Sequence, residues 1–129
     1  MNERFLLDTN AAIAYMAQEN SILMLIENAD AVFVPSIVLG ELFYGAEKSG
    51  RVEANRAEVE TFAMSGAVLN CDAGSARQYG HIRQMLRSKG KPIPQNDTWI
   101  AALALQHKLI LLTKDHHFNE VEGLLIQGW

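Results

Sequence analysis

The apolar run Leu109-Ile110-Leu111-Leu112 is the feature that most limits the folds open to this chain. An unbroken run of this kind is typical of a strand that is buried on both faces of a parallel sheet. The segments at 4–7 and 31–34 indicate further strands, and segments with helical spacing separate them. Because strands alternate with helices, the sequence predicts an α/β fold with three α/β/α layers around a parallel sheet of four to five strands.

The other elements are predicted from helical spacing and from capping or helix-breaking residues. Ser36 and Asn96 are expected to cap helices, and Asp72 is expected to open one. No repeat or linker interrupts the pattern, so residues 1–129 are predicted to form a single domain. The expected helices cover 10–18, 21–26, 36–48, 53–64, 72–90 and 96–107, and two short strands are expected at 68–69 and 124–126.

Composition narrows the function classes. The sole cysteine is Cys71, which rules out an internal disulfide, and we expect a reducing cytoplasm as the location and a core position for its side chain. No apolar run approaches the roughly 20 residues of a membrane span, so no membrane association is expected. A net charge of −4 argues against binding nucleic acid through overall positive charge.

The charges are unevenly distributed. Residues 73–96 contain no acid. A local basic segment on an acidic protein can contact a phosphate backbone, although an ordinary solvated helix face gives the same pattern. The candidate RNA-binding residues are Arg77, Arg83, Arg87, Lys89 and Lys91.

Two acids follow predicted strands. Asp8 ends the first strand and Asp115 follows the run at 109–112. Ligands of open α/β sheets bind at the carboxyl ends of the strands, which makes both acids candidate site residues. Each could also be a helix cap or a turn residue.

Two further acids lie in apolar surroundings. Glu41 is the sole charge in IVLGELFYGA, and a carboxylate there needs a cation, a metal or a hydrogen-bonded pocket; a structural salt bridge is the alternative. Asp97 begins the apolar helix of NDTWIAALAL, where it could simply complement the helix dipole. Clustered carboxylates repel one another unless cations neutralise them, and oxygen ligands favour magnesium or manganese over zinc.

Four stretches in this order, LLDTN, PSIVLGELFYGA, NDTWIAALAL and LLTKDHHF, resemble the PIN-domain ribonucleases, and within them the VapC-type toxins of toxin–antitoxin pairs. The resemblance implies a PIN-like domain with a metal site. It places catalytic, metal-binding acids at Asp8, Glu41, Asp97 and Asp115, of which the fourth varies most in the family. It places supporting polar residues at Thr9, Asn10, Ser36, Asn96 and Thr113.

The resemblance also implies a function. It predicts an endoribonuclease that depends on Mg²⁺ or Mn²⁺, leaves 5′-phosphate and 3′-hydroxyl ends, and inhibits translation and growth. The implied partners are RNA, a VapB-type antitoxin and a second copy of the chain, within a higher toxin–antitoxin assembly. Two alternatives stay open: a non-catalytic PIN-like module that binds a protein, and a phosphoacceptor or phosphatase domain with Asp8 as nucleophile.

Several other residues have simpler interpretations. His116 and His117 are adjacent, so their side chains should diverge and not share a zinc ion. Trp99 could stack on a base, but its apolar helix favours a place in the core or at an interface. Apolar helices around 13–25 and 38–44 carry more aliphatic surface than one small sheet covers, which indicates interfaces.

Overall fold

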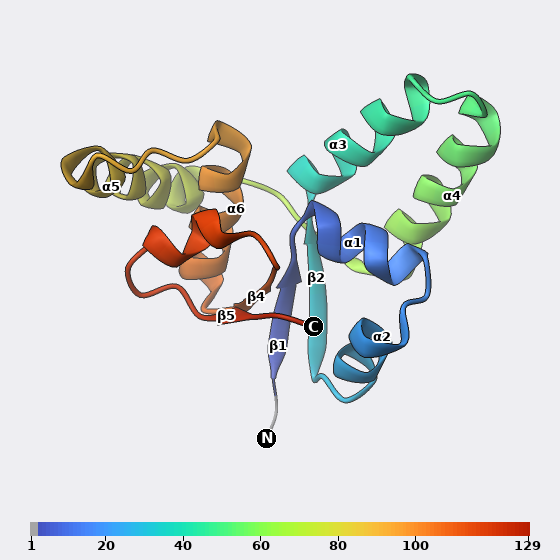
Figure 1. Cartoon of the computed structure of the whole chain (residues 1–129), viewed down its shortest axis with the longest axis horizontal. Helices are drawn as coiled ribbons and strands as arrows, with labels where there is room; N and C mark the ends of the chain where they lie inside the picture. The colour runs from blue at the N-terminus through green and yellow to red at the C-terminus, as the bar shows by residue number, and fades with distance from the viewer. Residues whose placement is uncertain (1–2) are drawn as a thin grey trace.

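A computed structural model describes residues 3–129 and confirms the α/β architecture. Five parallel strands form one sheet in the order β3-β2-β1-β4-β5. In Figure 1, β1 and β2 run through the middle of the molecule. The strands are β1 (Arg4–Leu7), β2 (Ala31–Pro35), β3 (Ala67–Leu69), β4 (Ile110–Leu112) and β5 (Ile126–Gln127).

Helices cover both sides of this sheet, which confirms the three layers. α1, α2 and α4 lie on one side, and α5 and α6 lie on the other (Figure 1). The helices are α1 (Thr9–Met16), α2 (Asn20–Glu27), α3 (Ser36–Glu47), α4 (Val52–Ser65), α5 (Ala73–Lys89) and α6 (Gln95–His107), followed by a 3₁₀ helix, η1 (His116–Glu120).

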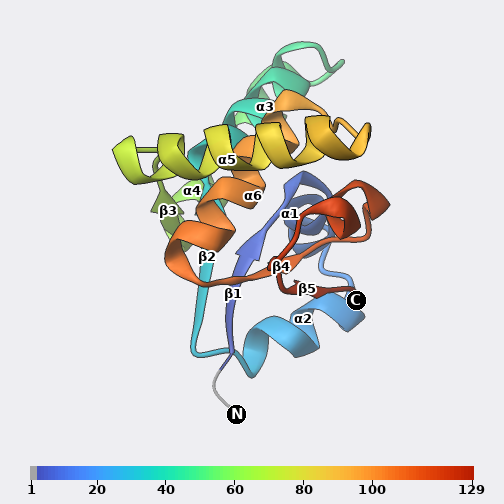
Figure 2. The ribbon, with the colours of Figure 1, turned by 90° about the vertical axis from the view of Figure 1, so that its left-hand side faces the viewer.

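The strand order explains how the layers arise. The chain moves outward from β1 to β2 and β3, and then returns past β1 to form β4 and β5. Because parallel crossovers keep a right hand, this reversal puts α5 and α6 on the opposite face from α1. Figure 2 shows α6 in front of the strands. The strand order reverses between β1 and β4, so the carboxyl ends of these two strands frame the crevice that binds ligands in such sheets.

The core holds α6 firmly against the sheet. Five consecutive residues of this helix, Ile100–Ala104, are at most 1% exposed, because the helix lies between the sheet and α5. Leu6 of β1 and Leu111 of β4, which are paired neighbours in the sheet, are fully buried. Each such leucine contributes on the order of 2 kcal/mol through burial. The first turn of α6 is therefore fixed in place relative to the strand ends.

Two helices begin earlier than the expected side-chain caps would place them, α3 by one residue and α6 by two. Pro35 and Pro94 occupy the N-cap positions, and neither makes a side-chain cap. Helices can start directly after a proline because its fixed φ suits the turn. Ser36 therefore lies in the first turn of α3 and Asn96 in the first turn of α6, and the prediction that these two residues cap their helices is wrong.

Three smaller expectations are also corrected. α1 ends at Met16 and not at 18, because Gln18 takes a left-handed φ of 58° that a helix cannot continue through. The last strand covers Ile126–Gln127 and not 124–126. Cys71 is exposed and not in the core, because it lies between β3, at the edge of the sheet, and the cap of α5.

Some large apolar side chains remain on the surface. Met24 and Tyr44 are each 65% exposed, and Ile13 is 49% exposed. They belong to α2, α3 and α1, within the two segments whose sequence indicates interfaces. None of the helices in residues 3–129 combines the length and the apolarity that a bilayer span requires.

Candidate metal centre

Asp8 connects β1 to α1. Its Oδ1 accepts a hydrogen bond of 2.8 Å from the backbone N–H of Ala11, so the expected helix-cap role is confirmed. The backbone N–H of Asp8 donates to the carbonyl oxygen of Leu112 at 3.3 Å, which ties the residue to the neighbouring β4. With 4% of its surface exposed, Asp8 is a buried acid at the carboxyl end of the first strand.

Thr113 joins the ends of β1 and β4. Its hydroxyl oxygen accepts a hydrogen bond of 2.9 Å from the backbone N–H of Asp115. The same hydroxyl donates to the carboxylate of Asp8. Thr113 is buried, with 2% of its surface exposed. Through its two hydrogen bonds, this one side chain holds two of the predicted acids at adjacent strand ends.

Glu41 comes from α3 and is held by two neutral donors. The Thr9 hydroxyl donates to Oε2 at 2.9 Å, and the Asn96 amide donates to Oε1 at 3.2 Å. No lysine or arginine among the described residues pairs with this carboxylate, so the salt-bridge alternative does not hold there. Glu41 thus links α1, α3 and α6 at the same edge of the sheet.

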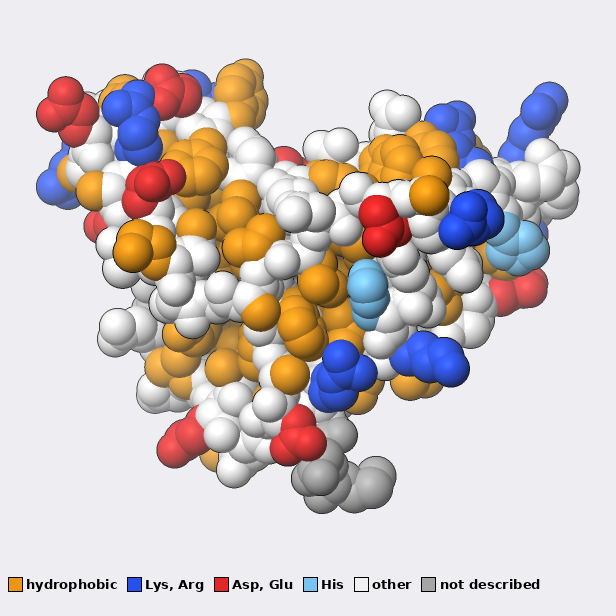
Figure 3. All heavy atoms as spheres, turned by 180° about the vertical axis from the view of Figure 1, so that it is seen from behind, with side chains coloured by type: hydrophobic (Ala, Val, Ile, Leu, Met, Phe, Trp, Pro, Cys, Tyr) orange, Lys and Arg blue, Asp and Glu red, His pale blue; other side chains and the backbone are white. Residues whose placement is uncertain are grey.

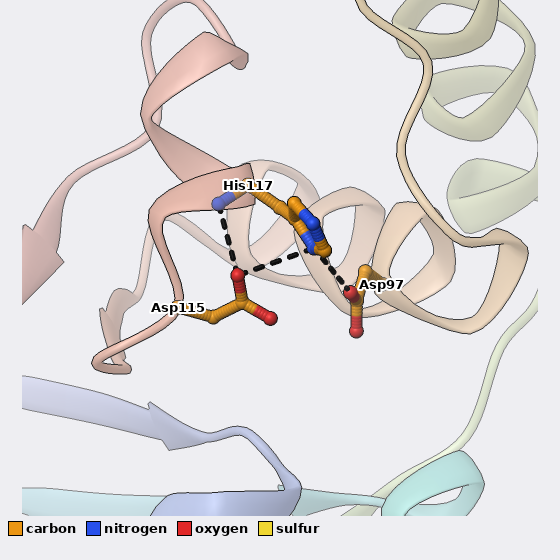
Figure 4. A group of neighbouring side chains, drawn as sticks. All are labelled: Asp97, Asp115 and His117. Atoms are coloured by element: carbon orange, nitrogen blue, oxygen red, sulfur yellow. Dashed lines mark hydrogen bonds and ion pairs between the residues drawn. The ribbon is translucent and has the colours of Figure 1, made fainter.

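Asp97 lies in the first turn of α6 and faces a histidine. Its Oδ2 is 3.5 Å from Nδ1 of His117, which is in turn 3.2 Å from Oδ1 of Asp115. Figure 4 shows the imidazole ring between the two carboxylates. One ligand atom from each of these three residues lies within 4.8 Å of the others, a spacing that could hold a metal ion.

The charges of Asp115 and Glu41 act on the other two acids of the cluster. Burial raises the pKa of Asp8, and the negative charges of Asp115 and Glu41 raise it further, against hydrogen bonds from Thr113 and a backbone amide. Burial also raises the pKa of Asp97, again with contributions from Asp115 and Glu41. Carboxylates that destabilise one another's charge in this way fit a divalent cation, which removes the repulsion.

The five predicted supporting residues divide into two groups. Thr9, Asn96 and Thr113 each form a hydrogen bond to one of the acids or to its backbone. The side chains of Asn10 and Ser36 form no hydrogen bond to residues 3–129. Both lie in the first turns of helices that begin at the site. The structure therefore brings three of the five into direct contact with the centre.

The predicted basic residues lie on α5 and the loop after it, and all are exposed. Lys89 Nζ donates to the backbone oxygen of Glu120 at 2.8 Å, and Lys91 is 4.0 Å from the carboxylate of Glu120. Within the described part of the chain, no ion pair involves Arg77, Arg83 or Arg87. Figure 3 shows Lys and Arg side chains at the end of the molecule where α5 lies.

Reasoning from the sequence missed His117 as a neighbour of the acids. The 3₁₀ turn of η1 folds it back, with its backbone N–H donating to Oδ1 of Asp115 at 2.9 Å. An aspartate followed two residues later by a histidine, directly after a strand, is the signal that could have indicated this turn. His116 is not part of the cluster, which agrees with the expected divergence of the two rings.

Trp99 makes its main aromatic contact within the protein. Its ring is stacked on that of Tyr79, with ring centroids 4.0 Å apart. Trp99 is half-buried, and the stack joins α6 to α5. This contact supports the packing role expected from its apolar helix.

Comparison with known proteins agrees with this geometry. Residues 5–124 match the PIN domain family. The chain is 35% identical to ribonuclease VapC2 of Haemophilus influenzae over 130 residues, and 35% identical to the tRNA(fMet)-specific endonuclease VapC of Shigella flexneri over 129 residues, with 98% of each chain covered in both cases. The structure is similar to the DNA-bound VapBC complex of Salmonella typhimurium, with a TM-score of 0.91, 36% identity, and 100% and 99% of the two chains covered.

Proposed function

The chain belongs to the PIN-domain family, and on that premise we propose that it is a metal-dependent endoribonuclease and the toxin of a toxin–antitoxin pair. One observation carries the proposal: four carboxylates from different elements converge where the strand order reverses. Their mutual repulsion and the raised pKa of two of them support a divalent cation. The four proposed catalytic and metal-binding residues are Asp8, Glu41, Asp97 and Asp115.

The carboxylate oxygens fit Mg²⁺ or Mn²⁺ best, since both ions prefer oxygen ligands. A bound ion of this kind makes a water molecule acidic enough to supply hydroxide near neutral pH and stabilises charge on the leaving oxygen. Thr113 orients Asp8 by hydrogen bonding, and Thr9 and Asn96 orient Glu41. When water forms the new bond to phosphorus and the 3′-oxygen leaves, the products are a 5′-phosphate and a 3′-hydroxyl, and this step needs no RNA 2′-hydroxyl.

The test is sequencing of RNA 5′ ends after brief induction of the wild type, Asp8→Asn and Asp30→Asn. Asp30 is exposed and lies before β2, so its variant controls for the loss of one charge. New 5′-phosphate ends are expected with the wild type and Asp30→Asn, and not with Asp8→Asn. The reads include tRNA(fMet), the substrate in the name of the Shigella relative. Equal cleavage by all three proteins contradicts the proposal.

The acidic centre needs cationic groups nearby to hold an RNA backbone. We assign this role to Arg77, Arg83 and Arg87 ahead of Lys89 and Lys91, because both lysines already contact Glu120. Replacing an arginine that contacts phosphate should weaken RNA binding and lower the slope of log affinity against log salt by about 1. Arg77→Gln, Arg83→Gln and Arg87→Gln are compared with Lys91→Gln, and equal slopes in all four variants contradict the assignment.

The proposed protein partners are a VapB-type antitoxin and a second copy of the chain. The similarity to VapBC complexes supports the first, and the exposed Ile13, Met24 and Tyr44 supply apolar surface for such contacts. Action on RNA places the protein in the cytoplasm, where Cys71 stays reduced. Light scattering of the chain alone and with a co-expressed antitoxin tests both contacts.

The two alternatives have distinct signatures. A non-catalytic binding module would leave purified chain inactive on RNA with either Mg²⁺ or Mn²⁺. A phosphoacceptor would form a phosphoryl adduct on Asp8 that is stable in acid and labile in base. The carboxylate of Asp8 is, however, already engaged with Ala11 and Thr113. Neither alternative is favoured by a contact at the centre.

A further inference from the structure

His117 lies at the metal centre without belonging to its set of acids. Its Nδ1 is 3.2 Å from Oδ1 of Asp115 and 3.5 Å from Oδ2 of Asp97. The ring nitrogen therefore points into the space between two carboxylates, as Figure 4 shows. A nitrogen in this place can act in two ways: as a protonated partner of the acids, or as a ligand beside them.

The position of His117 is set by the fold. The carboxylate of Asp115 accepts the backbone N–H of His117, so the same turn that starts η1 aims both side chains. The next residue, Phe118, is fully buried and anchors the turn in the core. Asp97 comes from the opposite side, on the rigid first turn of α6. Ligands held on rigid elements lose little freedom when an ion binds.

We propose that Nδ1 of His117 is a metal ligand, together with Asp97 and Asp115, and that this mixed set makes the centre favour Mn²⁺ over Mg²⁺. The inference rests on the proposed metal centre and refines it. Mg²⁺ is bound almost entirely through oxygen, whereas a first-row transition ion accepts imidazole nitrogen beside carboxylate oxygen. An imidazole that coordinates through Nδ1 carries its single proton on Nε2.

A purely structural role for His117 requires a proton on Nδ1, whereas coordination requires that Nδ1 carry none. A counter-ion to the two aspartates keeps its proton on Nδ1, and a protonated nitrogen cannot coordinate a cation. The two roles are therefore exclusive once an ion is bound. Direct coordination is visible in pulsed electron paramagnetic resonance, because a nitrogen bound to Mn²⁺ gives ¹⁴N modulation of the Mn²⁺ signal.

The experiment uses the full chain loaded with Mn²⁺ alone, as wild type, His117→Gln and His116→Gln. His116 is the matched control, since it is adjacent and outside the cluster. We expect ¹⁴N modulation in the wild type and His116→Gln and none in His117→Gln. Calorimetric titration should show that His117→Gln weakens Mn²⁺ binding by about tenfold or more while Mg²⁺ binding is unchanged. Glutamine keeps the backbone N–H that the turn uses, and circular dichroism checks the fold.

Absence of ¹⁴N modulation in the Mn²⁺-loaded wild type overturns the proposal, as does equal Mn²⁺ affinity of His117→Gln and wild type. These readouts contain no RNA, so they separate the two claims. RNA cleavage without ¹⁴N modulation leaves the nuclease proposal standing and removes the ligand role of His117. ¹⁴N modulation without RNA cleavage keeps the ligand role of His117 and removes the nuclease proposal. If no divalent ion binds, both proposals fall.

Discussion

Asp8 and Asp72 both cap helices, but the pKa of Asp8 is raised and that of Asp72 is lowered. Each is the N-cap of a helix and accepts a backbone N–H three residues further on. Asp72 also accepts from the side chain of Gln106 at 2.7 Å, and this bond, with those from Ser75, lowers its pKa. Burial and neighbouring acids raise the pKa of Asp8. The capping motif is therefore shared by a structural and a site residue, and the surroundings of the carboxylate distinguish them.

The largest expected difference between the two capping aspartates is in the rate of RNA cleavage. Asparagine caps helices as well as aspartate does, so the folds of Asp8→Asn and Asp72→Asn should persist. We expect Asp8→Asn to lower RNA cleavage by about 100-fold or more, and Asp72→Asn to leave it unchanged. Cleavage of labelled RNA by purified, antitoxin-free protein measures both. A loss of similar size in both variants would show that capping, and not the metal centre, governs activity.

The response to metal is the next test of the comparison. An ion that binds the folded chain stabilises it by about 2.7 kcal/mol at 100 times its Kd, which raises Tm by roughly 10 °C at this size. Wild type and Asp72→Asn should gain this stability with Mn²⁺, and Asp8→Asn should gain much less. Thermal melts with and without chelator measure the shift. A full gain in Asp8→Asn would exclude Asp8 as a ligand.

Stability against pH should change in opposite directions in the metal-free protein. Asp8 has a raised folded-state pKa, so its ionisation destabilises the fold as pH rises above its ordinary value of 3.8. Asp8→Asn should therefore raise Tm by a few degrees at pH 7, with no gain below pH 3.8. Asp72 has a lowered pKa, so its contribution is present at pH 7 and is lost in acid.

Asp72→Asn should accordingly lower Tm at pH 7, with a difference that disappears as pH falls through the folded-state pKa of Asp72. Melting curves of the three proteins in chelator over this pH range test the two signs together. Shifts of the same sign at pH 7 would mean that the two carboxylates have similar surroundings in solution.

The smallest expected effect concerns two asparagines near the centre. Asn96 donates to Glu41 at 3.2 Å, whereas Asn10 lies in the first turn of α1 without a side-chain hydrogen bond to the described residues. One such bond is worth about 1 kcal/mol, so Asn96→Ala should lower cleavage about fivefold. Asn10→Ala should match the wild type. Steady-state cleavage rates compare the pair, and equal rates would remove Asn96 from the support of Glu41.

Much of the centre could be predicted because it depends on local patterns. Apolar runs locate the strands, and the acids that follow them, Asp8 and Asp115, reach the same edge of a parallel sheet. Glu41 stood out because its neighbours are apolar. Polar residues that follow the strand ends, at the point where the strand order reverses, can thus be predicted from the sequence.

The contacts between distant segments could not be predicted in this way. The bond from Asn96 to Glu41 joins residues 55 apart, and no periodicity encodes it. His117 joins the acids through a short 3₁₀ turn whose direction depends on the burial of Phe118. The sequence also misplaces the first residues of α3 and α6. Pro35 and Pro94 occupy the N-cap positions for which a polar residue is expected.

The spread of the centre along the chain has a consequence during synthesis. Asp8 is synthesised more than 100 residues before Asp115 and His117, and β4 cannot pair with β1 before both strands exist. A nascent chain that has not yet reached Asp115 therefore lacks part of the proposed set of metal ligands. Under the proposed function, such a chain is not yet an active nuclease beside the ribosome's own RNA.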